Sequence, residues 1–218
     1  MSLSNIAKAA GMAALMCSAS ANAAIILSAA PGNAVYSGPA PTTDFESPAP
    51  EFSGGSVVTG TTPIHTTPLG STGFYGSVSP TNGTPGFLDL PGGTETISFI
   101  WGSVDTENIL SVLDAADNVL FSVNGSDIVA LLGGTTPGLR FDVDPNLNPI
   151  VTLQFTDADI GTASRLKFES TKEAFEFDNF AVAAVPEPAT WAFMILGFGA
   201  IGGAMRRQRK ANVKVSYA

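Results

Sequence analysis

Fifteen residues decide the fold class: Ile109-Leu110-Ser111-Val112-Leu113-Asp114-Ala115-Ala116-Asp117-Asn118-Val119-Leu120-Phe121-Ser122-Val123. Two apolar runs, rich in β-branched and long side chains, flank a polar segment of Asp, Ala and Asn. Two such runs joined by turn-forming residues are typical of a β-hairpin. The stretch therefore predicts two antiparallel strands, over 109–113 and 119–123.

The sequence on both sides of this hairpin repeats the strand pattern. Ile97, Phe99 and Trp101 occupy alternate positions, so Trp101 is expected in the core. Further segments with two-residue alternation follow at 139–144, 151–155, 165–169 and 174–182. Strands at this spacing, separated by turn residues, are typical of a sandwich or barrel. We predict an all-β fold, an antiparallel β-sandwich, with one short helix over 127–132 that ends at Gly133-Gly134.

The last of these segments, 174–182, changes phase. Phe175 and Phe177 share one parity, whereas Phe180 and Val182 share the other. The slip falls at Asp178-Asn179 and predicts a β-bulge, a feature that re-aims side chains and often adjoins functional sites. The alternative is that these two polar residues only satisfy a bend near the rim of the sandwich.

Residues 31–93 contain ten Pro and twelve Gly, which excludes a long helix. We expect turns, loops and short strands at 57–58 and 74–78. A disordered linker is the alternative, but linkers rarely carry large aromatic side chains. This segment holds five of them that would anchor it to a core: Phe45, Phe52, Phe74, Tyr75 and Phe87.

The amino-terminal 23 residues have the composition of a secretory signal peptide. Lys8 precedes an apolar stretch from 9 to 17, and Ala21-Asn22-Ala23 forms an A-x-A cleavage site before Ala24. The chain's single cysteine, Cys17, lies inside this segment, so cleavage would leave a protein without cysteine. We therefore predict export, with the mature chain beginning at Ala24.

The carboxyl end has the features of a second targeting signal. Pro186-Glu187-Pro188 would form a rigid elbow, and it is followed by Trp191-Ala192. Residues 189–205 are apolar except for Thr190, at the short limit for a transmembrane helix. A basic cluster should act as the membrane stop and keep the tail, 211–218, cytoplasmic; its members are Arg206, Arg207, Arg209 and Lys210.

This three-part end, Pro186-Glu187-Pro188-Ala189-Thr190-Trp191-Ala192, apolar run and basic cluster, resembles the PEP-CTERM signal of Gram-negative bacteria in its Pro-Glu-Pro-x-x-Trp-Ala variant. The resemblance implies that the membrane protease-transpeptidase exosortase is a partner. It also implies an intermediate anchored in the inner membrane and a final place at the cell surface, in the outer envelope or in the extracellular polysaccharide matrix. An uncleaved membrane anchor is the alternative.

A second resemblance concerns the region 42–188. The segments 43–47, 97–105, 123–128 and 174–179 look like those of an uncharacterised family of exosortase-dependent ectodomains with a jelly-roll-like sandwich, similar to carbohydrate-binding modules. The expected organisation is a signal peptide (1–23), an N-terminal extension (24–41), a β-sandwich ectodomain (42–183) and a sorting signal (184–210) that contains the helix 189–205.

The charge of the exported part argues against nucleic acid as a partner. Residues 24–185 hold 18 of the 19 acidic residues and four of the ten basic residues, a net charge of about −14. This charge would repel phosphates, but it suits neutral sugars, divalent cations or simple solubility.

Catalytic chemistry has little support. The one histidine, His65, lies in a Thr- and Pro-rich loop without a nucleophile elbow, and no zinc, phosphate-loop or dinucleotide motif is present. We therefore expect no catalytic residues, no enzyme activity and no firm cofactor. A secreted hydrolase that uses two carboxylates is the third and least favoured function.

Calcium is the one cofactor to consider. Asp142 and Asp144 begin a run of oxygen-bearing side chains at alternate positions, although the run lacks the glycine and glutamate of an EF-hand. Glu46 with Asp178 resembles the rim cation site of carbohydrate-binding jelly rolls. A solvated strand face is the alternative for all four carboxylates.

The exported protein is thus predicted to be structural or adhesive. A carbohydrate-binding module is the alternative, and it would present aromatic side chains to a sugar. Tyr36 and Tyr75 lie in loop-rich sequence and are freer to do so than Trp101.

Overall fold

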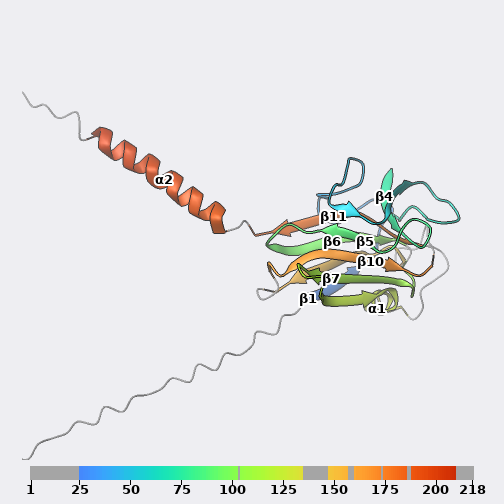
Figure 1. Ribbon diagram of the computed structural model, residues 1–218. Helices are drawn as coiled ribbons and strands as arrows, with labels where there is room; N and C mark the ends of the chain where they lie inside the picture. The colour runs from blue at the N-terminus through green and yellow to red at the C-terminus, as the bar shows by residue number, and fades with distance from the viewer. Residues whose placement is uncertain are drawn as a thin grey trace, which may run out of the picture.

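The computed structural model describes residues 25–102, 104–134, 147–156, 160–172, 174–185 and 188–209, and these form two antiparallel sheets and two helices (Figure 1). The six-stranded sheet has the order β1 (Ile25–Ala30), β9 (Ile150–Phe155), β6 (Thr94–Gly102), β11 (Phe175–Ala184), β4 (Phe74–Val78) and β3 (Ser56–Thr59). The five-stranded sheet has the order β2 (Phe52–Ser53), β5 (Gly86–Asp89), β10 (Ala163–Ser170), β7 (Asn108–Asp114) and β8 (Val119–Asn124). The helices are α1 (Gly125–Leu131) and α2 (Pro188–Arg209). The prediction of a mostly β chain with antiparallel strands is confirmed.

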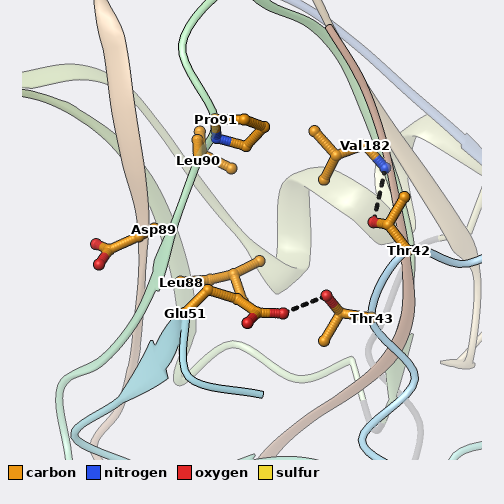
Figure 2. A pocket seen from close by; sticks show the side chains of 8 residues that line it. All are labelled: Thr42, Thr43, Glu51, Leu88, Asp89, Leu90, Pro91 and Val182. Carbon is orange, nitrogen blue, oxygen red and sulfur yellow. Dashed lines mark hydrogen bonds between the residues drawn. The ribbon is translucent and has the colours of Figure 1, made fainter. Parts of the chain in front are cut away.

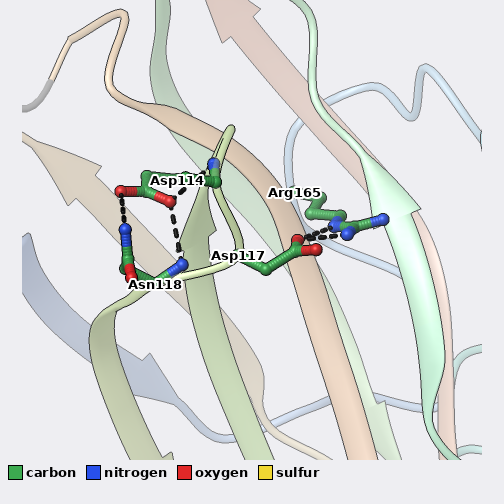
Figure 3. A network of polar contacts seen from close by, with 5 residues as sticks. Asp114, Asp117, Asn118 and Arg165 are labelled. Atoms are coloured by element: carbon green, nitrogen blue, oxygen red, sulfur yellow. Dashed lines mark hydrogen bonds and ion pairs between the residues drawn. The ribbon is translucent and has the colours of Figure 1, made fainter.

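The predicted hairpin forms as β7 and β8. Asp114 organises its turn, because its carboxylate accepts hydrogen bonds from the backbone N–H groups of Ala116 and Asn118, both at 2.8 Å (Figure 3). Asp117 adopts a positive φ of 64° and pairs with Arg165 of the neighbouring β10. The turn is thus fixed both to itself and to the next strand of the sheet.

The core between the sheets is aromatic. Trp101 of β6 stacks on Phe175 of β11 with ring centroids 4.4 Å apart, and Phe168 of β10 stacks on Phe177 of β11 at 4.1 Å. Such pairs stabilise by about 0.5–1.5 kcal/mol beyond the burial of their area. The predicted core position of Trp101 is confirmed, since its side chain is fully buried.

The outer face of the six-stranded sheet is also covered. Ser98 and Ile100 of β6 point away from the aromatic core, yet both are buried. Residues 60–73, called the cover segment here, lie over this face: a Cβ added to Gly102 would come within 2.7 Å of Pro68. Both faces of β6 are therefore buried, so the alternation of its side chains does not distinguish a core face from a solvent-exposed face.

The strand β1 falls in the region expected to be an N-terminal extension (24–41). It pairs with β9 from Ile25 opposite Phe155 to Ala30 opposite Ile150, and its side chains alternate between half-buried and exposed. Its half-buried residues Ile25, Leu27 and Ala29 pack against the core. The sandwich thus begins before residue 42, because an edge strand of small and apolar residues completes the sheet.

The short helix α1 corrects one detail. Asn124 is the N-cap of α1, and it exchanges hydrogen bonds with Asp127 in a capping box. The expected helix at 127–132 therefore begins two residues earlier, at Gly125. The expected strand over 139–144 lies outside the described residues.

Candidate functional site

A β-bulge interrupts β11 where the sequence predicts one. Asn179 has a φ of 56°, and the pairing of β11 with β6 shifts register between Asp178 and Ala181. Asn tolerates this left-handed conformation better than most residues. Because of the extra residue, Phe177 and Phe180 both face the core, while Asp178 faces the other side of the sheet.

The bulge makes room for a distant segment. The strand β4 pairs with β11 only from Phe175 to Phe177, and beyond that point the backbone of Thr43 pairs with Phe180 instead. Phe45 follows with a φ of 59° and inserts its ring beside Phe52, Phe177 and Phe180, at centroid distances of 5.5, 6.0 and 6.1 Å. The sequence segments 43–47 and 174–179 are therefore neighbours in space.

Asp178 is buried beside the bulge, at 1 % exposure. Its carboxylate accepts hydrogen bonds from the Ser71 hydroxyl at 2.5 Å and from the Asn179 backbone N–H at 2.7 Å. Burial raises the pKa of Asp178 to about 7, and repulsion from Asp44 and Glu46 adds to the rise. The protonated form is therefore favoured at pH values where an exposed aspartate is ionised.

Glu46 and Asp178, the predicted cation pair, lie close enough to repel each other but are held by different partners. The exposed Glu46 accepts a hydrogen bond from the backbone N–H of Phe74 at 2.7 Å, whereas Asp178 bonds to Ser71. Within the described ranges, no group of three or more His, Cys, Asp or Glu side chains is placed to hold a metal ion. Asp142 and Asp144 lie outside the described residues, so calcium binding stays a prediction.

Buried polar side chains tie the cover segment to the sheet. Glu176 of β11 accepts a hydrogen bond from the Thr66 backbone at 2.8 Å, and Asn148 accepts one from the Leu69 backbone at 3.0 Å. His65 Nδ1 lies 2.7 Å from the Tyr75 hydroxyl. Because that hydroxyl donates to the Gly60 carbonyl, His65 is the donor in this contact. The one histidine thus has a structural partner.

The two tyrosines considered for sugar binding, Tyr36 and Tyr75, both have structural contacts. Tyr75 is fully buried under the cover segment, and this burial raises its pKa to about 12. Tyr36 is half-buried, and its hydroxyl donates to the Pro39 carbonyl at 2.9 Å. The prediction that Tyr75 is freer than Trp101 to face a ligand is wrong, because a loop folds over the outer face of the sheet and buries it.

A pocket of about 410 Å³ opens at the rim between the two sheets (Figure 2). Leu88, Leu90, Pro91 and Val182 give it apolar walls, and Glu51 lies across it. The Glu51 carboxylate accepts a hydrogen bond from the Thr43 hydroxyl, and the Val182 N–H donates to Thr42 Oγ1 at 3.3 Å. The remaining lining residue is Asp89, whose carboxylate points away from the other side chains.

Sequence reasoning misses this pocket entirely. Its walls come from the segment 42–51, from the end of β5 with residues 90–91, and from β11. None of these segments has a local signature of binding. The pairing of Thr43 with Phe180 and the hydrogen bond from the Asp89 backbone N–H to the Glu51 carbonyl, at 2.9 Å, bring them together.

The helix α2 contains most of the predicted carboxyl-terminal sorting signal. It begins at Pro188, where a proline suits the first helical turn, and extends through Arg209, so the predicted helix 189–205 is found with longer ends. Trp191 is 53 % exposed, and Ala192 and Arg206 are exposed too. Arg207 and Arg209 lie in its last turn.

That this helix crosses a membrane stays a prediction. Among the residues that the structure describes, no helix is both long enough and apolar enough to cross a membrane. The other predicted address residues lie outside the described ranges: Ala21, Ala23, Ala24, Pro186, Glu187 and Lys210.

Comparison with known proteins identifies one segment of the chain. Residues 184–210 match the family model of the PEP-CTERM protein-sorting motif. The match begins at the last residue of β11 and takes in the whole of α2. No curated protein and no solved structure matches the chain.

Proposed function

We propose that this chain, which carries the PEP-CTERM protein-sorting motif at 184–210, is an exported surface protein that exosortase processes and that then serves a structural or adhesive role. The observation that carries the proposal is the motif itself, which starts where the last strand of the sandwich ends. The signal peptide expected at 1–23 fits the same route. The processed domain would pass from an intermediate at the inner membrane to the outer envelope or the polysaccharide matrix.

The described residues favour a scaffold over an enzyme. The buried polar groups that could do chemistry are engaged in holding the cover segment and the bulge: Glu176 on Thr66, Asp178 on Ser71 and His65 on Tyr75. A carbohydrate-binding module, the alternative function, would present exposed aromatic rings. Trp101 and Tyr75 are instead fully buried, and the half-buried Tyr36 has its hydroxyl bonded to the Pro39 carbonyl, which favours the structural role.

Intact-mass analysis tests the sorting. The full chain is expressed in a Gram-negative host with an exosortase, and the surface fraction is compared with that of a host without the enzyme. The surface form should begin at Ala24, end near Pro186 and lack Trp191 onward. A control chain with Pro186→Ala and Pro188→Ala should keep its tail. Surface protein that retains residues 191–218 in the presence of the enzyme would contradict the proposal.

A further inference from the structure

The two ends of the sandwich emerge at the same end of the six-stranded sheet. Ile26 of β1 lies opposite Gln154 of β9, which also lies opposite Thr96 of β6, and Thr96 lies opposite Ala183 of β11. The four residues form one row across the sheet. With strands about 4.8 Å apart, the start of β1 and the end of β11 are about 14 Å from each other. We call this end of the domain the exit pole (Figure 1).

The rim pocket lies at the exit pole. Its wall residue Val182 directly precedes Ala183, and Pro91 lies in the loop that ends at Gly93. The Gly93 carbonyl accepts a hydrogen bond from the backbone N–H of Val185 at 2.8 Å. This bond fixes the chain to the sandwich until one residue before the Pro-Glu-Pro elbow. The pocket wall at Val182 and the fixed residue Val185 therefore lie three positions apart in the chain.

The distance from the pocket to the Pro-Glu-Pro elbow is shorter than the radius of a typical protein–protein interface. Val182 and Pro186 are four positions apart, a distance of at most about 13 Å along the chain. A specific protein interface covers about 800 Å² on each partner, and a disc of that area has a radius of about 16 Å. An enzyme that binds Pro186–Pro188 with an interface of this size therefore also covers the pocket, unless the surface of the enzyme is recessed at that point.

The residues that line the pocket indicate which kind of side chain it would bind. Four of the eight lining side chains are apolar, Glu51 is among the other four, and no basic residue lines the pocket. The cations of the described sandwich are engaged elsewhere: Arg165 pairs with Asp117, Lys167 with Glu169 and Lys172 with Glu107. A pocket with apolar walls and the Glu51 carboxylate in its lining matches a side chain with an apolar stem and a charged head, as Lys and Arg have.

We propose that the rim pocket is a docking site for a Lys or Arg side chain of the enzyme that processes the tail. This inference rests on the proposed function and adds a second recognition point to the sorting motif. The stem packs between Leu88, Leu90 and Val182, and the charged head meets Glu51. The folded domain thereby places its own tail in the enzyme.

Charge variants of the full chain test the site. The rate of tail removal is followed by pulse-chase in the exosortase host for the unaltered chain, Glu51→Lys, Glu51→Gln and Glu95→Lys. Glu95 is exposed on β6 near the same pole and is not part of the pocket, so it reports any general effect of charge. Glu51→Lys should slow processing about tenfold or more, Glu51→Gln several-fold, and Glu95→Lys less than twofold. Circular dichroism melting of the purified chains verifies that each variant is folded.

The outcomes separate the two proposals. If the unaltered chain keeps its tail, the proposed sorting fails and the docking site falls with it. If the unaltered chain is processed and both Glu51 variants keep its rate, the docking site is refuted while the sorting stands. Equal slowing by Glu51→Lys and Glu95→Lys also refutes the pocket, because it shows a general charge effect. If Glu51→Lys does not fold, Glu51→Gln decides, since it retains the size of Glu51 and a group that can bond to Thr43.

Discussion

The backbones of Thr43 and Phe180 exchange two hydrogen bonds, with N···O distances of 3.0 and 2.8 Å. The pair exists because the bulge at Asn179 ends the pairing of β11 with β4 and leaves an edge that a loop residue completes. It places Phe45 in the core and brings Thr43 to Glu51 at the rim pocket. One irregularity in a strand thus supports both the packing and the candidate docking site.

The bulge makes Asn179 sensitive to the shape of its replacement. Asn179→Val should reduce the free energy of unfolding by about 2 kcal/mol, because a β-branched residue is strained at a φ of 56°. Asn179→Gly accepts this φ without strain and should change stability by less than about 1 kcal/mol. Urea unfolding of the two variants measures the difference. Equal losses would show that the side chain of Asn179, not its backbone, matters.

Phe45 should behave as a core residue despite its place in a loop. Phe45→Ala removes its contacts with Phe52, Phe177 and Phe180 and should cost about 3–5 kcal/mol. Phe74, which is 45 % exposed at the start of β4, is the matched control, and Phe74→Ala should cost about 1 kcal/mol or less. Chemical denaturation distinguishes them. Similar small losses would mean that segment 42–46 detaches from the sandwich without consequence.

Asp178 should make the domain less stable as the pH rises. Its folded pKa, about 7, exceeds its ordinary value of 3.8, so the folded state holds the proton more tightly. The stabilisation is complete below about pH 4 and is lost as the pH rises through 7. A shift of about three units corresponds to at most about 4 kcal/mol. Asp105, with a pKa raised to about 6 mainly by burial, contributes in the same direction.

Asp178→Asn, which imitates the protonated form, should therefore exceed the unaltered domain in stability at pH 8 and lose that advantage at pH 4.5. Urea midpoints at both pH values give the comparison. Glu95→Gln is the control, since it removes a carboxylate from the exposed surface of β6 and leaves the bulge intact. A constant difference between Asp178→Asn and the unaltered domain would show that Asp178 does not titrate in this range.

Calcium binding is tested by melting temperature. A ligand that binds only the folded state at a hundredfold excess over its Kd stabilises by about 2.7 kcal/mol, which is several degrees for a domain of this size. Millimolar calcium should therefore raise the melting point more than magnesium does. Asp178→Ala should remove the difference if Glu46 and Asp178 hold the ion, and Asp144→Ala if the 142–148 loop does. Equal effects of both ions would indicate charge screening alone.

The class of the fold and the position of the bulge follow from local patterns in the sequence. The hairpin at 109–123, the spacing of the strands and the parity change between Phe177 and Phe180 are local patterns, because side chains alternate along a strand whatever its partners are. The sorting signal was readable for the same reason, since its proline elbow, apolar run and basic cluster lie within one short segment.

The tertiary structure alone decided which distant residues meet. The cover segment buries Tyr75 and Glu176 on a face that the strand pattern cannot distinguish from solvent. The strand β1 belongs to the sandwich because it pairs with the edge of β9. The pattern of its six residues does not indicate which strand it pairs with. The rim pocket depends on the pairing of Thr43 with Phe180, and the exit pole depends on the register of four strands. Contacts between residues far apart in the chain arise from packing and register, which a single sequence leaves open.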